Sequence, residues 1–264
     1  MIGVIGTDST NGTNGTQDQL GEGETAMSHG HTSTDNGTGA TGTTDPTEAN
    51  GGGGGGGTNE EFWDSRYGES DRVWSGNPNT VLVREITGLT PGRALDLGCG
   101  EGADAIWLAT RGWQVTASDI SGVALAKGRR HAAEAPDGVA SRIDWQRHDL
   151  GVSFPAGTFD LVSTHFLHTP GDMPREEILR TAAAAVAPGG VLLIVGHAGL
   201  PSWEPRPHPE VHLPTPDEVV ESLQLPDGEW EVLLSEEHER IQIRPDGQPG
   251  TRTDNAVKVR RRAV

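Results

Sequence analysis

The sequence predicts an α/β fold, an open and mostly parallel seven-stranded sheet with helices on both faces and an antiparallel strand pair at its end. Three observations predict it. Short apolar runs alternate with helical stretches from residue 59 onward. The strand-like run 93–97 leads directly into a glycine-rich loop, and the last two strand-like runs, 230–243 and 255–262, are separated by a turn-forming segment, 244–251.

The first 57 residues are excluded from this fold by their composition. They contain 17 of the 38 glycines and 12 threonines, but no aromatic residue, Lys or Arg, and they end in seven consecutive glycines. So few apolar side chains cannot offset the entropy lost on ordering the backbone. We therefore predict a disordered, acidic Gly/Thr-rich tail at 1–57 and one folded domain at 58–264. The sequence leaves open whether Met27 is the true start.

The elements of the predicted domain follow one another in a regular order. Helical spacing of apolar residues predicts helices at 60–67, 79–87, 103–111, 121–134, 174–186 and 216–223. Apolar runs between them predict strands at 93–97, 113–118, 141–148, 158–164 and 191–196, followed by the terminal pair. Proline density excludes helix and central strand at 201–209. That segment is predicted to be a surface loop.

Composition excludes several classes of protein. The formal net charge of −18 argues against a nucleic-acid surface, which needs clustered Lys and Arg. A single cysteine rules out an internal disulfide and favours a reducing compartment. Neither a membrane-spanning apolar run nor a signal peptide is recognisable. We therefore expect a cytoplasmic protein without a membrane partner.

The most informative segment joins the strand 93–97 to the helix that follows it. Gly98, Gly100 and Gly102 occupy alternate positions there. Backbone amides and the positive end of the helix then face a ligand at the strand tip, and missing Cβ atoms let that ligand approach the main chain. In open α/β sheets, ligands bind at this edge. The segment therefore predicts a ligand-binding loop.

Two ligand classes fit this loop. Gly98, Gly100 and Ala103 satisfy a dinucleotide pattern, and Asp119 follows at the distance of a ribose-binding acid, so an NAD(P)-dependent oxidoreductase is one alternative. Asp96 favours a different ligand, because its carboxylate repels a pyrophosphate and attracts the cationic amino-acid end of S-adenosylmethionine. Asp149 closes the next strand, where it suits an adenine amino group. A non-catalytic module that binds the cofactor or a partner is a third alternative.

The motifs together resemble those of a known family. Asp96–Gly102, Asp119, Asp149 and the run 159–164 are similar to the successive motifs of class I S-adenosylmethionine-dependent methyltransferases, over about residues 60–262. The lead-in 62–79 and His165-Phe166-Leu167-His168 resemble the small enzymes related to tellurite-resistance and thiopurine methyltransferases. The resemblance implies a Rossmann-like sheet, S-adenosylmethionine as cofactor, and methyl transfer as the activity.

The resemblance also implies cofactor-binding positions, most of them at strand ends. They are Gly98, Cys99, Gly100 and Gly102 around the methionine moiety, Asp96 by its ammonium, Asp119 at the ribose, Ile120, Asp149 and Leu150 at the adenine, and Thr164 and His165 below the sulfonium. Trp63, Tyr67 and Trp74 would form an aromatic lid, since rings attract a cation. The bland alternative is a core-facing helix at these aromatics. Cys99 is expected to pack rather than to act as a nucleophile.

The acceptor is predicted to be a small molecule, a thiol, soft anion or hydroxyl, methylated by in-line displacement. The acidic charge and the absence of an Asn-Pro-Pro-Tyr-type motif after residue 164 favour this class. A general base is needed only for a protonated acceptor, with His165 and His168 as first candidates and His197 as a third. We expect the pocket to be built from 63–79, 165–173 and 198–216. No metal is predicted, because Pro209 interrupts the pair His208 and His212.

Overall fold

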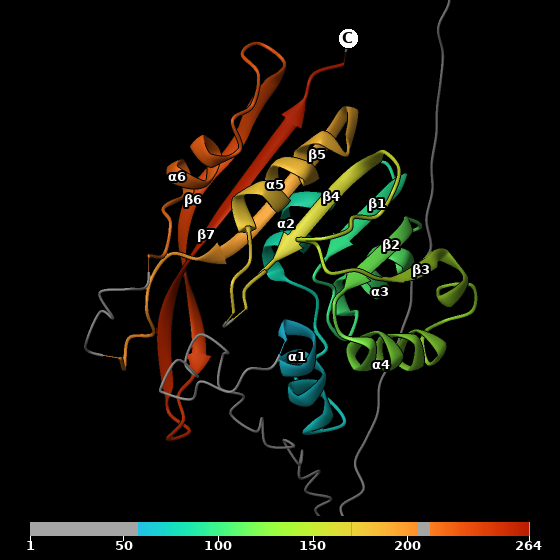
Figure 1. Ribbon diagram of the computed structural model, residues 1–264, viewed down its shortest axis with the longest axis vertical. Helices are drawn as coiled ribbons and strands as arrows, with labels where there is room; N and C mark the ends of the chain where they lie inside the picture. The colour runs from blue at the N-terminus through green and yellow to red at the C-terminus, as the bar shows by residue number, and fades with distance from the viewer. Residues whose placement is uncertain (1–57, 170, 205–211, 264) are drawn as a thin grey trace, which may run out of the picture. The chain divides into compact units, whose positions relative to one another are not determined.

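The computed structural model describes residues 58–169, 171–204 and 212–263 (Figure 1). The predicted tail, 1–57, lies outside the described residues, and so does most of the proline-dense loop, at 205–211. The division into a tail and one domain therefore stays a prediction. In the part of the chain that is described, no helix is long and apolar enough to cross a membrane.

The described strands form one seven-stranded sheet in the order β3-β2-β1-β4-β5-β7-β6. Their bounds are β1 (Arg93–Leu97), β2 (Gln114–Asp119), β3 (Ile143–Arg147), β4 (Phe159–His165), β5 (Val186–His197), β6 (Trp230–Ile243) and β7 (Pro249–Arg261). β1 to β5 pair in parallel, whereas β7 runs antiparallel to both of its neighbours. The predicted Rossmann-like fold class, with its terminal antiparallel pair, is confirmed.

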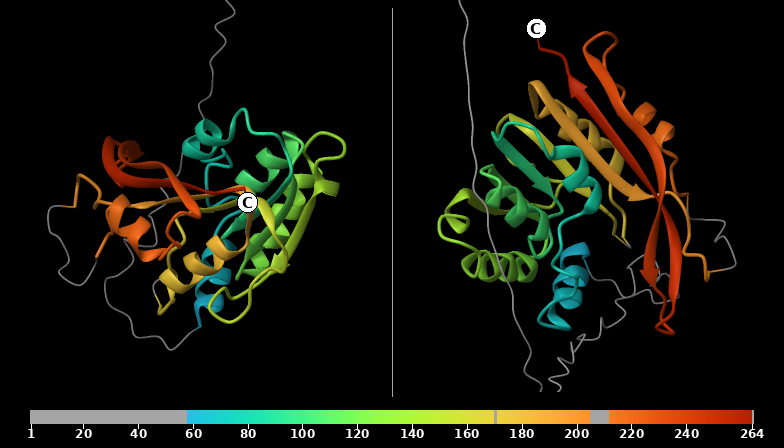
Figure 2. Two further views of the ribbon diagram at one scale, coloured as in Figure 1. Left: turned by 90° about the horizontal axis from the view of Figure 1, so that it is seen from above. Right: turned by 180° about the vertical axis from the view of Figure 1, so that it is seen from behind.

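Helices cover both faces of this sheet (Figure 2). They are α1 (Asn59–Gly68), α2 (Thr80–Ile86), α3 (Ala103–Thr110), α4 (Gly122–Ala133), α5 (Arg175–Ala184) and α6 (Pro216–Ser222), with a short 3-10 helix, η2 (Ala140–Arg142). Apolar side chains of α2, α3 and α4 pack on one face, and those of α5 and α6 on the other. The first turn of α1 carries a capping box between Thr58 and Glu61.

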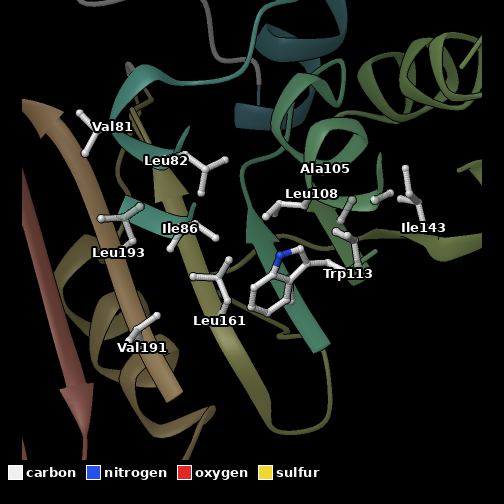
Figure 3. Packing of buried hydrophobic residues seen from close by; sticks show 14 of the residues in the cluster. Val81, Leu82, Ile86, Ala105, Leu108, Trp113, Ile143, Leu161, Val191 and Leu193 are labelled. Carbon is white, nitrogen blue, oxygen red and sulfur yellow. The ribbon is translucent and has the colours of Figure 1, made fainter. Parts of the chain in front are cut away.

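Alternation along β1 explains how one short strand serves two cores. Ala94 belongs to the cluster under α2 and α3, and Leu95 and Leu97 belong to the cluster under α5 (Figure 3 shows the first cluster). All three side chains are fully buried. Asp96 shares the face of Ala94 but lies near the carboxyl end, so the sheet presents an acid where β1 meets the glycine loop.

Two strands are longer than predicted. β5 begins at Val186 rather than 191, because Val186 pairs with Phe159 across a shift in register. β7 begins at Pro249 rather than 255, because the segment 249–254 pairs with β6 along its whole length. Pro249 has no amide hydrogen to donate. It is tolerated in β7 because the pairing with β5 ends at Asp254, so β5 needs no hydrogen bond from residue 249.

β6 and β7 continue beyond the end of the pairing between β5 and β7. Residues 239–243 and 249–253 pair with each other beyond the last β5–β7 pair, His197 with Asp254, and backbone amides of 198–202 donate to Thr251 and Thr253. We call residues 239–253 the hairpin extension. It continues past the carboxyl ends of the parallel strands, the edge that α1 also covers (Figure 1).

Candidate active site at the carboxyl edge of the sheet

A cavity of about 1040 Å³ lies at the carboxyl edge of the sheet. Its walls come from the loops after β1, β2, β3 and β4, from α1 and the segment 72–80, from His197, and from residues 240–243 of the hairpin extension. We call the part over β1, β2 and β3 the cofactor end, and the part bounded by the loop after β4, His197 and the hairpin extension the acceptor end. Its position agrees with the ligand edge of open α/β sheets.

The glycine loop forms the floor of the cofactor end. Gly98 and Gly100 have φ values of 71° and 54°, which favour glycine. A Cβ atom on Gly98 would lie 2.9 Å from Leu167 Cδ1, and one on Gly100 would lie 2.8 Å from the Tyr67 hydroxyl. Gly98, Cys99 and Gly100 all line the cavity. The loop therefore needs both glycines for its backbone and for its close packing.

Gly102 has a different role from the other two glycines. Its φ is 85°, and a Cβ atom there would lie 2.3 Å from the ring of Trp145. Among the described residues that line the cavity, Gly102 is not found. Glycine at this position lets Trp145 pack under the start of α3. The predicted contact between Gly102 and the ligand stays a prediction.

Asp119, the last residue of β2, is held by two backbone amides. Its Oδ2 accepts from Gly100 N and its Oδ1 from Ser121 N, both at 2.9 Å. Burial raises the pKa of this carboxyl above its usual value. The side chain is 7% exposed and lines the cavity together with Ile120. Each oxygen keeps a second lone pair, so the carboxylate can accept from two neighbouring hydroxyls.

Asp149 and Leu150 follow β3 and also line the cofactor end. Asp149 Oδ1 accepts from Gly151 N at 3.0 Å, which shapes the turn after the strand. The consecutive strands β1, β2 and β3 thus bring the glycine loop, Asp119 and Asp149 to one end of the cavity, as the order of motifs predicts.

Asp96 lies beneath the glycine loop rather than on the cavity wall. It is 2% exposed, and its Oδ2 has no hydrogen-bond partner within the described chain. Burial, and then the nearby charge of Asp104, raise the pKa of Asp96 to about 8. Thr164 is 1% exposed and is likewise below the wall, with an unpartnered hydroxyl in the described chain. The charge of His165 lowers the pKa of Asp96 by less than burial and Asp104 raise it, so the floor holds a buried acid whose Oδ2 has no hydrogen-bond partner in the described chain.

His165 ends β4 and forms a pair with Asp104 from the first turn of α3. The distance from His165 Nδ1 to Asp104 Oδ2 is 2.7 Å, and Asp104 Oδ1 accepts from Asn79 N at 2.6 Å. Burial alone lowers the pKa of His165, but the charges of Asp104 and Asp96 outweigh it and raise that pKa. His165 therefore favours the protonated form.

These side chains form the one group in the described residues with a possible metal-ligand arrangement. Donor atoms of Asp96, Asp104 and His165 lie within 4.8 Å of one another. Asp104 and His165 already bond each other, which occupies one ligand atom on each. The absence of a metal stays a prediction, and His208 of the proposed histidine pair lies outside the described residues.

The three lead-in aromatics lie together over the glycine loop. Tyr67 is 5% exposed, its hydroxyl accepts from Trp74 Nε1 at 3.2 Å, and the rings of Trp63 and Tyr67 are 5.8 Å apart. All three line the cavity, and all three also pack with Ala124 of α4 in one apolar cluster. The same residues therefore fit both interpretations, a lid and a core-facing helix.

Glu101, which sequence reasoning missed, anchors this lead-in. Its carboxylate accepts from Val73 N at 3.0 Å, from Trp74 N at 3.1 Å and from Lys127 Nζ at 3.2 Å. The glutamate is 6% exposed, so the bonds are buried and well shielded from water. The available signal was Lys127, one of only two lysines in the chain, within the predicted helix 121–134.

The acceptor end contains a second histidine–aspartate pair, also missed as a unit. His197 Nδ1 lies 2.8 Å from Asp254 Oδ1, and Asp254 Oδ2 accepts from Arg240 Nε at 2.7 Å. Burial opposes ionisation of Asp254, but the bonds from His197 and Arg240 prevail and lower its pKa. His197 and Arg240 line the cavity, and Asp254 lies behind them, fully buried.

Rings from the loop after β4 hold His197 in place. Phe166 stacks on His197 at 4.7 Å and 30°, and His168 stacks on it at 5.0 Å and 8°. The Cζ atom of Arg240 lies 5.2 Å from the centre of the Phe166 ring. Phe166 has a φ of 53°, an unfavourable conformation for a residue with a side chain. The strained turn brings both rings against His197.

Part of the cavity rim is apolar, at the hairpin extension and at the loop after β3. Val152, Ile241 and Ile243 line the cavity while 84%, 74% and 44% exposed. The predicted pocket segments 63–79 and 165–173 do contribute to the wall, but no described residue of 198–216 does. The hairpin extension contributes instead, and only the length of β6 and β7 reveals it.

Comparison with known proteins agrees with this geometry. Residues 94–190 match the family described as methyltransferase domain. This part of the chain is similar to class I, S-adenosylmethionine-dependent methyltransferase domains. The match covers β1 to the start of β5, which includes the glycine loop and the strand ends at Asp119 and His165.

Relatives of this methyltransferase domain differ in what their names say they methylate. The ribosomal RNA small subunit methyltransferase C of Chromohalobacter salexigens is 38% identical over 113 residues, which cover 41% of this chain and 32% of that protein. The 2-heptyl-1-hydroxyquinolin-4(1H)-one methyltransferase of Mycobacteroides abscessus is 31% identical over 144 residues, which cover 52% and 61%. The chain spans roughly a third of the length of the first of these relatives.

The solved structure of TehB from Haemophilus influenzae has the same fold as this chain. Its TM-score is 0.55 at 18% identity, and the match covers 77% of this chain and 67% of TehB. At this identity the similarity shows a shared fold.

Proposed function

We propose that the protein transfers a methyl group from S-adenosylmethionine to a small-molecule acceptor. The observation that carries the proposal is the buried carboxylate of Asp96 beneath the glycine loop, whose Oδ2 has no partner in the described chain. Its pKa is raised to about 8 even though the charge of His165 opposes the rise, so a further cation above the loop would stabilise the ionised form. An ammonium group supplies that cation, whereas a pyrophosphate does not.

The residues at the cofactor end fit this cofactor. S-adenosylmethionine supplies a methyl group bound to a positively charged sulfur. The backbone of Gly98, Cys99 and Gly100 would hold its amino-acid part above Asp96, and Asp119 would accept from its ribose hydroxyls. Ile120, Asp149 and Leu150 would bound the adenine. The alternative, an NAD(P)-dependent oxidoreductase, would place a pyrophosphate over the glycine loop, where Asp96 lies beneath it and its ionised form would repel the phosphates.

A small acceptor is supported by charge and by the shape of the cavity. The net charge of −18 disfavours a nucleic acid. A cavity of about 1040 Å³ accommodates a cofactor and a compact acceptor together. One relative is named for a small hydroxyquinolinone and another for ribosomal RNA, so relatives alone do not select the acceptor. Thiols, soft anions and hydroxyls are the proposed classes, and the cytoplasm is the proposed compartment.

Isothermal titration calorimetry separates the two cofactor classes. We expect S-adenosylhomocysteine to bind the purified protein and NADH to give no measurable heat. Methyl transfer itself is then measured by homocysteine release with thiols, tellurite and phenols as acceptors. Binding of NADH without binding of S-adenosylhomocysteine would contradict the proposal.

Tight binding of S-adenosylhomocysteine without turnover of any acceptor would instead favour the third alternative, a non-catalytic module.

A further inference from the structure

We propose that His197, positioned by Asp254, is the general base of this methyltransferase, and that its acceptor is a hydroxyl-bearing aromatic molecule with apolar substituents. The proposal rests on the methyl transfer proposed above. It selects one of the three acceptor classes and one of the histidines at the strand ends.

The hydrogen bonds orient His197 for proton transfer. Its Nδ1 donates to Asp254 Oδ1 at 2.8 Å, so proton transfer to or from an acceptor uses Nε2. The ring is 2% exposed, lines the acceptor end of the cavity, and is stacked against Phe166 and His168. The hydrogen bond at Nδ1 and the stacking on the ring faces keep the imidazole in one orientation, which a general base requires.

The surroundings of the two histidines explain why His197 rather than His165 accepts the proton. His165 faces the carboxylates of Asp104 and Asp96, whose charges raise its pKa and make it a poorer proton acceptor than its position suggests. Asp254 is shared between His197 and Arg240, and the guanidinium balances the carboxylate before His197 gains any charge. The two pairs thus differ in the donor to the second aspartate oxygen, which is a guanidinium at Asp254 and a backbone amide at Asp104.

The remaining groups against His197 do not add a second negative charge. Asp254 comes from β7, Arg240 from β6, and Phe166 and His168 from the loop after β4. When His197 takes up a proton, the new charge faces Asp254 directly and is stabilised by it. This arrangement resembles the orienting role of an aspartate behind a catalytic histidine.

The walls near His197 select the rest of the acceptor. Ile241 and Ile243 of the hairpin extension and Val152 of the opposite loop are exposed apolar side chains at the same cavity. Leu167 and Met173 also line it. A flat, apolar ring buries this surface, whereas an inorganic anion such as tellurite would leave it in water. An aromatic hydroxyl matches both the base and the rim.

The proposed step conserves atoms and charge. The hydroxyl oxygen of the acceptor forms the new bond to the methyl carbon while its proton passes to His197 Nε2. The carbon–sulfur bond breaks, and its electron pair stays on sulfur, which loses its positive charge. The products are a methyl ether, S-adenosylhomocysteine and a protonated His197, which returns its proton to solvent.

A panel of para-substituted phenols of graded acidity tests this proposal. Phenol, 4-methylphenol, 4-chlorophenol and 4-nitrophenol are supplied with S-adenosylmethionine at constant pH, and initial rates are compared between wild type, His197→Gln and Asp254→Asn. We expect His197→Gln to lose about 10²–10⁴-fold on phenol and 4-methylphenol and far less on 4-nitrophenol, which ionises without help. The plot of rate against phenol acidity therefore becomes steeper.

Asp254→Asn should steepen the same plot by a smaller amount, because it misorients the base without removing it. The matched control is His212→Gln, a histidine with a side chain 74% exposed, which should leave every rate unchanged. Calorimetry with S-adenosylhomocysteine and thermal unfolding show whether each variant is folded and binds cofactor.

Three results would overturn the proposal. An equal loss on all four phenols would assign His197 a structural role. A steeper plot for His165→Gln, but not for His197→Gln, would move the base to the other pair. Failure of wild type to methylate any phenol, whether or not thiols or tellurite react, would reject the acceptor class. Failure to bind S-adenosylhomocysteine is a separate result, because it rejects the proposed cofactor itself.

Discussion

The two ends of the cavity are built in different ways from similar side chains. Each contains a histidine–aspartate pair at the end of a parallel strand, His165–Asp104 at β4 and His197–Asp254 at β5. At the first pair, the second aspartate oxygen accepts from a neutral backbone amide, and another acid, Asp96, lies close by. At the second pair, that oxygen accepts from a guanidinium. The first aspartate therefore lies beside another acid, whereas the second is paired with a positive charge.

The cofactor end is determined by backbone, and the acceptor end by side chains. The amides of Gly100 and Ser121 fix Asp119, and two glycines with positive φ set the loop. At the acceptor end, stacked rings and an ion pair from three separate strands and loops fix His197. A change at the first end should therefore affect cofactor binding, and a change at the second should affect acceptor use. The predictions below test that division.

The largest effect is expected for Asp119→Ala. Removing the carboxylate deletes two charge-assisted hydrogen bonds to the ribose and releases Gly100, so affinity for S-adenosylhomocysteine should fall about 100-fold or more. Calorimetry measures the affinity, and Asp144→Ala, an exposed acid on β3, is the control. Unchanged affinity in Asp119→Ala would show that the cofactor does not contact β2.

We expect Asp96→Asn to lower the affinity for S-adenosylhomocysteine and to raise the stability of the cofactor-free protein. The folded pKa of about 8 exceeds the ordinary value of 3.8, so the folded state holds a proton that the unfolded state has released, and wild type loses stability as pH rises from 4 through 8. The variant lacks this loss. At pH 8 we expect its cofactor-free Tm to lie a few degrees above wild type, with affinity for S-adenosylhomocysteine about tenfold lower.

Thermal unfolding at pH 6 and pH 8, with and without S-adenosylhomocysteine, tests the Asp96→Asn prediction. The gap in Tm between variant and wild type should be wider at pH 8 than at pH 6 in the absence of cofactor. A gap that does not change with pH would mean that Asp96 is ionised in the empty site.

A smaller effect is expected at the apolar rim. The double substitution Ile241→Ser and Ile243→Ser removes exposed apolar surface from the hairpin extension, so the KM for an aromatic acceptor should rise several-fold while cofactor affinity stays constant. Val232→Ser, an equally exposed residue of β6 that does not line the cavity, is the control. An equal loss of cofactor affinity would contradict the separate roles of the two ends of the cavity.

No effect on either end is expected from deleting residues 1–57. If the proposed domain at 58–264 is complete in itself, the truncated protein should keep the Tm, the cofactor affinity and the acceptor KM of the full chain. Side-by-side calorimetry and unfolding of both forms measure this. A loss of cofactor affinity would show that residues 1–57 contribute to cofactor binding.

The residues that the sequence predicts for the cofactor end lie together because that end is local in the chain. Gly98, Asp119 and Asp149 each follow a strand, and consecutive parallel strands bring their ends to one edge of the sheet. Each residue is thus identified by its own strand and by its order in the chain. Gly102 is different, because the missing Cβ atom there makes room for the ring of Trp145, more than 40 residues later in the chain.

The acceptor end depended on the tertiary structure. His197, Arg240 and Asp254 meet only because β7 returns antiparallel between β5 and β6 and because both terminal strands extend beyond the sheet. Register across distant strands is set by packing of the whole core, and no local pattern encodes it. By itself, the sequence therefore determined the fold class and the ligand loop. The folded chain decided which histidine faces a guanidinium-balanced aspartate, because that choice depends on residues brought together from distant strands.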